Sequence, residues 1–223
     1  MQTISDLRKS DNYIKNNKVF ITNNLDLKSF FLLIRPTKNI YKNAKENALV
    51  ERQIEKLIKK GFQNLEISWS DNENWFNYVS NLKFKFPKLN LGSASVINKK
   101  SIDESIEIGL NYSMMKVWDK DLLNYSNSKN YLLIPGIKNL KDLKEAIDLN
   151  CKIIKIYPVK DKNILINISQ YKNIDFIAAG ALSIADLPLY KSLGYKSIVI
   201  GDKGFKNNHV DPKIYEWLKE TSN

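Results

Sequence analysis

One lysine lies inside an apolar run that ends at a proline, the segment from Ile153 to Pro158 with Lys155 at its centre. An ammonium group that leaves water must be paired or must lose its proton. A neutral amine in an apolar pocket can attack a ketone and form a Schiff base. The alternative is that Lys155 lies on an edge strand with its charged end in solvent. The rest of the chain decides between these interpretations.

Apolar runs typical of β-strands alternate along the chain with amphipathic runs typical of α-helices. The helical runs have apolar residues three and four positions apart, as in residues 139–150. Gly61, Gly109 and Gly194 each end a helical run just before a strand, where a left-handed cap is needed. The eight strand-like runs are residues 30–34, 64–68, 89–94, 112–117, 131–135, 153–157, 174–178 and 197–200.

This alternation predicts an α/β fold with a parallel sheet, and eight repeats favour a closed (β/α)8 TIM barrel. The alternative is an open doubly wound sheet. That sheet would need a Gly-rich phosphate motif after the first strand, which instead ends at residues 35–37, Arg-Pro-Thr. We therefore predict one barrel domain over residues 1–223 with an extra N-terminal helix, expected at residues 4–17. Its parts are an N-terminal helix and arm at 1–28, the barrel strands at 30–205 and a C-terminal helix at 211–221.

The composition argues against several classes of function. The net charge of +11 comes from lysines spread between acidic residues, so we expect no nucleic-acid partner. With a single cysteine, Cys151, and a single histidine, His209, we expect neither an intramolecular disulfide nor a metal site. Because no apolar run is long enough to span a membrane and no signal peptide is evident, we expect no membrane partner and a cytoplasmic location.

In a TIM barrel the reactive groups gather at the carboxyl ends of the strands. Three polar residues there could act together, namely Arg35 after the first strand, Glu66 in the second and Lys155 in the sixth. A guanidinium, a carboxylate and an amine would then meet at one mouth. The alternative for Glu66 and Lys155 is a buried ion pair with only a structural role.

Several segments in the predicted strands share their order with the landmarks of a known family. Residues 155–158 read Lys-Ile-Tyr-Pro, residues 61–68 place a glutamate after a glycine, and residues 33–35 end in arginine. Residues 91–96 and 134–136 supply a Gly-containing strand and a Pro-Gly pair. Over about residues 30–205 the chain resembles the class I 2-keto-3-deoxy-6-phosphogluconate and 4-hydroxy-2-oxoglutarate (KDPG and KHG) aldolases.

The resemblance implies a reaction that needs no cofactor or metal. Lys155 would form a Schiff base with a small-molecule 2-keto acid, and Glu66 would move protons. A 2-keto-3-deoxy-6-phospho sugar acid or 4-hydroxy-2-oxoglutarate would yield pyruvate and an aldehyde, and the protein would be a homotrimer. Arg35 would hold the substrate carboxylate. The other substrate-binding positions are Ser68, Ser95, Lys116, Pro135, Gly180, Ala181, Gly201 and Lys203.

The chain departs from the family pattern where the family binds anions. Ala181 replaces the second glycine of a turn whose amides bind phosphate, and residues 201–204 replace a Gly-Ser pair. Ser70 stands where some members have an arginine. Lys116 and Lys203 could supply replacement contacts, and Lys116 could also lower the pKa of Lys155 as a like charge. The sequence therefore leaves open whether the substrate carries a phosphate.

Two other functions remain open on these residues. One is a non-catalytic barrel that binds an acidic metabolite or a protein partner, because the phosphate turn is altered. The other is a phosphosugar isomerase or epimerase in which Glu66 abstracts a proton.

Overall fold

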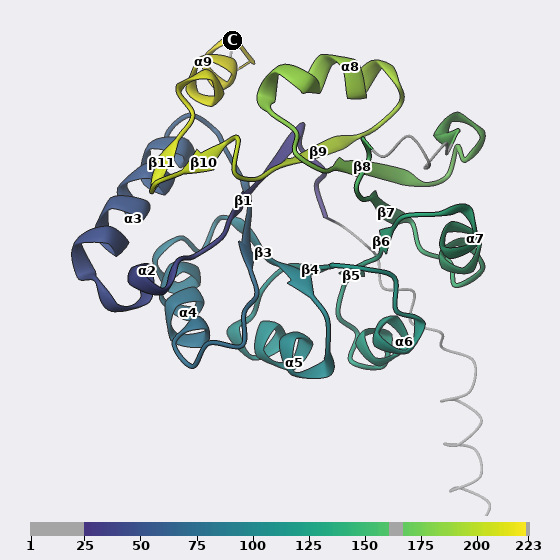
Figure 1. Cartoon of the computed structure of the whole chain (residues 1–223), viewed down its shortest axis with the longest axis horizontal. Helices are drawn as coiled ribbons and strands as arrows, with labels where there is room; N and C mark the ends of the chain where they lie inside the picture. Colours follow the sequence, from purple (N-terminus) through teal and green to yellow (C-terminus); the bar gives the residue numbers. More distant parts are fainter. Residues whose placement is uncertain (1–24, 161–166, 222–223) are drawn as a thin grey trace, which may run out of the picture.

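The computed structural model describes residues 25–160 and 167–221, in which parallel strands form a ring surrounded by helices (Figure 1). The helix predicted at residues 4–17 lies outside the described residues. The strands of the ring are β1 (Phe30–Ile34), β2 (Asn64–Ser68), β3 (Asn90–Val96), β4 (Tyr112–Met115), β5 (Leu133–Ile134), β6 (Gly136–Ile137), β7 (Ile153–Ile156), β8 (Asp175–Ala179) and β9 (Ser197–Ile200).

The ring is closed by one strand that a proline divides. All neighbours in the sheet pair in parallel, in the order β5-β4-β3-β2-β1-β9-β8-β7-β6. β5 pairs with β4 and β6 pairs with β7, and only Pro135 separates β5 from β6. Proline has no N–H to give to a ladder, so it interrupts the strand without ending it. β5 and β6 together occupy one strand position, so the ring has eight strand positions, and the TIM-barrel prediction is confirmed.

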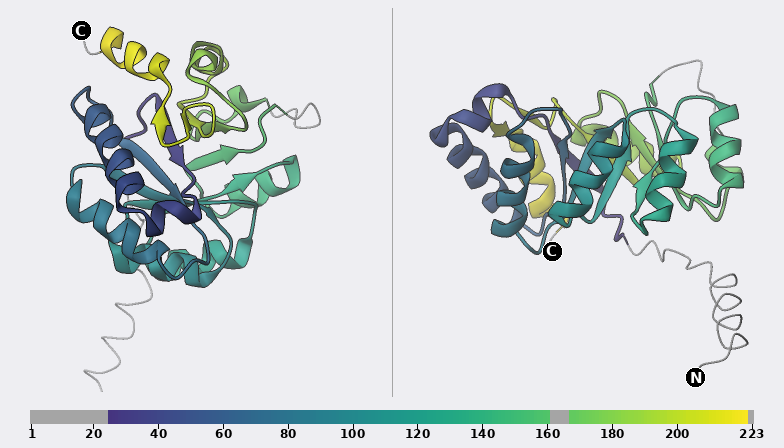
Figure 2. Two further views of the ribbon diagram at one scale, coloured as in Figure 1. Left: turned by 60° about the vertical axis from the view of Figure 1, so that its left-hand side comes forward. Right: turned by 90° about the horizontal axis from the view of Figure 1, so that it is seen from below.

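The helices stand outside the strands in all three views (Figures 1 and 2). Gly61, Gly109 and Gly194 have φ angles of 82°, 76° and 95°, as expected for left-handed caps. A short antiparallel pair, β10 (Phe205–Lys206) and β11 (His209–Val210), precedes the last helix. The helices are α2 (Lys38–Lys42), α3 (Ala44–Ile58), α4 (Trp75–Lys85), α5 (Lys99–Ile108), α6 (Lys120–Ser128), α7 (Leu140–Asp148), α8 (Leu187–Ser192) and α9 (Pro212–Thr221), with 3₁₀ turns η1 (Ile168–Gln170) and η2 (Ile184–Asp186).

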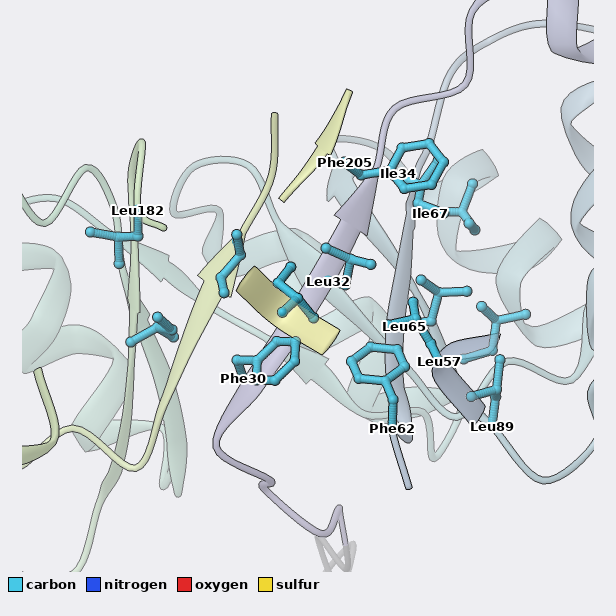
Figure 3. Packing of buried hydrophobic residues seen from close by; sticks show 14 of the residues in the cluster. Phe30, Leu32, Ile34, Leu57, Phe62, Leu65, Ile67, Leu89, Leu182 and Phe205 are labelled. Carbon is cyan, nitrogen blue, oxygen red and sulfur yellow. The ribbon is translucent and has the colours of Figure 1, made fainter. Parts of the chain in front are cut away.

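Alternate residues of the strands face the helices outside the ring and the interior of the barrel, where they form separate apolar cores. Phe30, Leu32 and Ile34 of β1 pack against the helices in the larger core, part of which Figure 3 shows. Phe31 and Leu33 of the same strand point into the barrel. This period of two is what the pleated strand requires. A polar residue whose two neighbours in the strand face the helices must therefore point into the barrel.

The same alternation sends the two predicted catalytic residues into the barrel. Leu65 and Ile67 belong to the outer core, so Glu66 between them points inward. Ile154 and Ile156 likewise belong to the outer core and flank Lys155. The apolar neighbours of each residue therefore fix the side of the wall on which it lies.

Candidate active site

A cavity of about 930 Å³ opens at the carboxyl ends of the strands. Its wall includes ten of the eleven residues that the sequence predicted for the site. The exception is Pro135, which is buried in the wall and accepts a backbone hydrogen bond of 2.9 Å from Lys155. The ten residues are Arg35, Glu66, Ser68, Ser95, Lys116, Lys155, Gly180, Ala181, Gly201 and Lys203.

Glu66 lies on the floor of this cavity, with only 1% of its surface exposed. Its Oε1 atom has no hydrogen-bond partner among the described residues. Burial raises the pKa of Glu66 to about 7, although the positive charges of Lys155 and Arg35 oppose the rise. A buried carboxyl with one free oxygen and a pKa near neutrality can take up and release a proton during a reaction.

Lys155 is 7% exposed and lies on β7, diametrically across the ring from β2. Its Nζ atom donates a hydrogen bond of 2.6 Å to the carbonyl oxygen of Met115. Burial lowers the pKa of Lys155 to about 8, and the negative charge of Glu66 opposes the fall. Burial, rather than a like charge from Lys116, is therefore the cause of the lowering.

Gly136 provides the space in which the amine meets this carbonyl. It is paired with Lys155 in the β6–β7 register. A Cβ atom at position 136 would lie 2.7 Å from the carbonyl oxygen of Met115 and 3.4 Å from Cε of Lys155. The distance to the oxygen is too short for a carbon, so a side chain at this position would force the wall to move.

Arg35 lies at the rim, where it forms an ion pair of 2.7 Å from Nη1 to Oδ1 of Asp202. The guanidinium rests against Gly201, because a Cβ there would lie only 2.6 Å from Nη1. Both charged side chains are largely exposed, at 47% for Arg35 and 76% for Asp202. Asp202 is not among the residues predicted from the sequence, although it lies two positions after β9, a strand that pairs with β1.

Two hydroxyl groups lie at the ends of β2 and β3, on the side of β1 away from β9. The Ser68 hydroxyl donates a hydrogen bond of 3.3 Å to Oγ of Ser95, and both residues are half-buried. Ser95 has a φ of 62°, which turns its side chain into the cavity where the β3–β4 register shifts. Trp69 is a further wall residue that the sequence did not indicate, and its indole nitrogen donates to Glu104 at 2.7 Å.

The remaining predicted residues form the outer part of the mouth. Gly180 and Ala181 turn back after β8 with φ angles of 130° and 50°. Lys116 and Lys203 are exposed. Within residues 25–160 and 167–221, no group of three or more His, Cys, Asp or Glu side chains is placed to hold a metal ion. Among the same residues no helix combines the length and apolar character needed to cross a membrane.

A TIM barrel with a buried amine and a buried carboxyl at the carboxyl ends of its strands has the two groups that Schiff-base chemistry needs. The sequence model of the KDPG and KHG aldolases matches residues 39–214. The chain belongs to this family, and the prediction made from the landmark segments is confirmed.

Similar proteins include a curated relative and solved structures. A 2-dehydro-3-deoxy-phosphogluconate aldolase from Pseudoalteromonas atlantica is 26% identical over 141 residues, which are 61% of this chain and 65% of the relative. The chain thus matches slightly less than two thirds of that relative's length. The 2-keto-3-deoxy-6-phosphogluconate aldolase of Zymomonas mobilis superposes with a TM-score of 0.69 at 20% identity, covering 87% of this chain and 92% of that one.

A second solved structure shares the fold at lower identity. The KDPG aldolase of Legionella pneumophila, with pyruvate captured as a covalent carbinolamine intermediate, gives a TM-score of 0.68 at 14% identity. The superposition covers 86% of this chain and 91% of that one. At such identities the likeness establishes the fold, and the chemistry must be argued from the residues of this chain.

Proposed function

We propose that the protein is a class I aldolase that cleaves a 2-keto acid with a hydroxyl at C4 into pyruvate and an aldehyde. The substrate class includes 2-keto-3-deoxy sugar acids, with or without a 6-phosphate, and 4-hydroxy-2-oxoglutarate. The observation that carries the proposal is the buried Lys155 amine, with a lowered pKa, in one cavity with the buried Glu66 carboxyl.

The chemistry begins when the neutral Lys155 amine attacks C2 of the substrate. The carbinolamine that forms loses water and becomes a protonated imine, which draws electrons toward nitrogen. The C4 hydroxyl then gives up its proton, the C3–C4 bond breaks and its electron pair forms an enamine. A proton added at C3 and hydrolysis of the imine release pyruvate and restore the amine.

Glu66 is the group suited to carry these protons. It lies in the same cavity as Lys155, and its pKa near 7 lets it act as both acid and base close to neutral pH. Its Oε1 atom has no hydrogen-bond partner among the residues described, so the carboxyl keeps hydrogen-bonding capacity that no protein group there uses.

The carboxylate of the substrate is bonded directly to C2, so it must bind near Nζ of Lys155. Ser68 and Ser95 offer half-buried hydroxyls in the same cavity. Arg35, for which the resemblance implied this role, is at the rim and is already paired with Asp202. We therefore assign the substrate carboxylate to the serine hydroxyls, with Lys116 as the nearby cation.

Borohydride reduction in the presence of pyruvate tests the proposal. We expect a stable adduct on Lys155 that peptide mass spectrometry locates, and no adduct in Lys155→Met. Lys152→Met is the matched control, because Lys152 is exposed and only three positions away. An adduct elsewhere refutes the assignment to Lys155, and the absence of any adduct refutes the Schiff-base chemistry.

The open alternatives give different results in the same preparation. A non-catalytic barrel would bind 2-keto acids in calorimetry but release no pyruvate in an assay coupled to lactate dehydrogenase. An isomerase or epimerase would introduce solvent deuterium into a sugar phosphate equally well in Lys155→Ala.

We also propose a homotrimer and a cytoplasmic location, to be checked by light scattering and by cell fractionation.

A further inference from the structure

The Arg35–Asp202 pair places a carboxylate at the rim of the site, beside a guanidinium that could otherwise bind an anion. We propose that Asp202 makes the enzyme select neutral, hydroxylated aldehydes over phosphorylated ones. The inference rests on the proposed aldolase function and names the class of aldehyde that the same site accepts.

The burial of the residues indicates which end of the substrate meets Asp202. Lys155 and Glu66 are almost fully buried, whereas Arg35 and Asp202 are 47% and 76% exposed. The substrate is attached at C2 to the buried amine, and its aldehyde half extends away from that point. The end farthest from C2 therefore reaches the rim, where Arg35 and Asp202 lie.

This part of the rim offers little charge for an anion. Nη1 of Arg35 already donates to Asp202, so the pair is neutral as a unit. Because Asp202 offsets the charge of Arg35, Lys203 alone adds a net positive charge to this part of the rim. A phosphate would bring a charge of about −1.5 to −2 close to the Asp202 carboxylate.

The turn after β8 lies on the same side of the mouth. Ala181 holds a methyl group at a φ of 50°, a conformation that glycine adopts without strain. Lys160 is nearby, with Nζ 3.5 Å from the carbonyl oxygen of Ala181, but it is also paired at 3.4 Å with Asp186. The turn therefore lacks the open backbone and the unpaired cation that would favour close approach of a phosphate.

A hydroxyl group suits the pair better than an anion does. It can donate a hydrogen bond to a carboxylate oxygen of Asp202 and accept one from the guanidinium of Arg35. Both bonds form without separating the ion pair. A polyhydroxylated aldehyde thus keeps the rim intact, while a phosphate must compete with Asp202 for Arg35.

Aldol addition of pyruvate to two acceptors tests the inference. D-glyceraldehyde and D-glyceraldehyde 3-phosphate differ only in the phosphate. We expect kcat/KM at least tenfold higher for D-glyceraldehyde in the parent protein. Asp202→Asn should shift the ratio at least tenfold toward the phosphorylated acceptor. Asp148→Asn, an equal charge change on the exposed end of α7, should leave the ratio unchanged.

Three results would overturn the inference. These are a preference of the parent protein for the phosphorylated acceptor, a preference for anionic glyoxylate, and a ratio that Asp202→Asn does not change. Exchange of the pyruvate methyl protons with solvent needs no aldehyde and is measured in parallel. If exchange occurs with the wrong selectivity, only this inference fails, and if no exchange occurs, the aldolase proposal fails with it.

Discussion

The Nζ atom of Lys155 donates a hydrogen bond of 2.6 Å to the backbone carbonyl oxygen of Met115, 40 positions earlier in the chain. The two residues belong to β7 and β4, which are separated in the ring by the strand that Pro135 divides into β5 and β6. A backbone carbonyl cannot be ionised and moves only with its strand. The amine is therefore held in place by a partner that accepts a hydrogen bond from either its charged or its neutral form.

Gly136→Ala should disturb this contact. The added carbon would lie 2.7 Å from the Met115 oxygen, and backbone cannot yield as a flexible side chain does. We expect a loss of about 1 to 3 kcal/mol in the free energy of unfolding, from overpacking. We also expect pyruvate proton exchange, followed by NMR in deuterium oxide, to fall about 100-fold because the amine is displaced.

Gly109→Ala is the control for a change in stability alone. Gly109 ends α5 with a φ of 76°, and no atom lies within 4 Å of the added carbon. This variant should lose about 1 kcal/mol through backbone strain and keep its exchange rate. An exchange rate in Gly136→Ala equal to that of Gly109→Ala would show that the Met115 contact does not position the amine.

The pH dependence of pyruvate exchange should report the buried pair. Burial lowers the pKa of Lys155 to about 8 and raises the pKa of Glu66 to about 7, so the pair loses both protons near neutrality. Because the neutral amine is the nucleophile, the exchange rate should rise from about pH 6 and level off above about pH 8. A rate that keeps rising to pH 10 would mean that Lys155 titrates like an exposed lysine.

Glu66→Gln should stabilise the fold while it removes the proton carrier. The folded-state pKa of Glu66 is raised from 4.5 to about 7, so ionisation destabilises the fold increasingly between these values and fully above pH 7. At about 1.4 kcal/mol for each unit, the gain in Glu66→Gln should approach about 3 kcal/mol at pH 8. It should disappear as the pH falls to about 3.5, below the unfolded-state pKa of 4.5, where the carboxyl is mostly protonated in both states.

Urea unfolding at the two pH values measures this gain. Glu104→Gln provides a matched control, since Glu104 is half-buried on α5 and its carboxylate accepts a hydrogen bond from the Trp69 indole. It should show no gain at pH 8. Equal stability of Glu66→Gln and the parent protein at pH 8 would contradict the raised pKa.

Ser95→Gly should separate the role of the hydroxyl from that of the backbone. Ser95 has a φ of 62°, which glycine adopts at no steric cost, so the free energy of unfolding should change by less than about 1 kcal/mol. Loss of the hydroxyl should raise KM for the keto acid about tenfold, the value of one hydrogen bond to a charged group. An unchanged KM would remove Ser95 from the carboxylate site.

Most of the barrel could be predicted because strand residues repeat with a period of two. The first, second and eighth predicted strands, at 30–34, 64–68 and 197–200, coincide with the observed ones. The fifth does not, since it was expected at 131–135 and runs instead through 133–137 around a proline. An apolar run sets which face is buried, but the ladder with both neighbours sets where pairing begins and ends.

The candidate site was predictable where the type of a residue alone distinguishes it from its neighbours in the sequence. Lys155 and Glu66 stand out because charged side chains are rare in apolar strands. The Met115 carbonyl does not, because every residue carries one. Asp202 was missed as a partner of Arg35 for another reason. The pair is 167 positions apart, and only closure of the ring brings β9 beside β1.

The strand that Pro135 divides has a consequence for how water reaches the interior. β5 and β6 each contribute two residues to the ladders, fewer than any other strand of the ring. Segments with few backbone hydrogen bonds open first in local fluctuations, so amide hydrogens here should exchange before those of β1 or β2. The barrel is thus a rolled sheet closed along one narrow seam, and that seam lies directly beside the reactive amine.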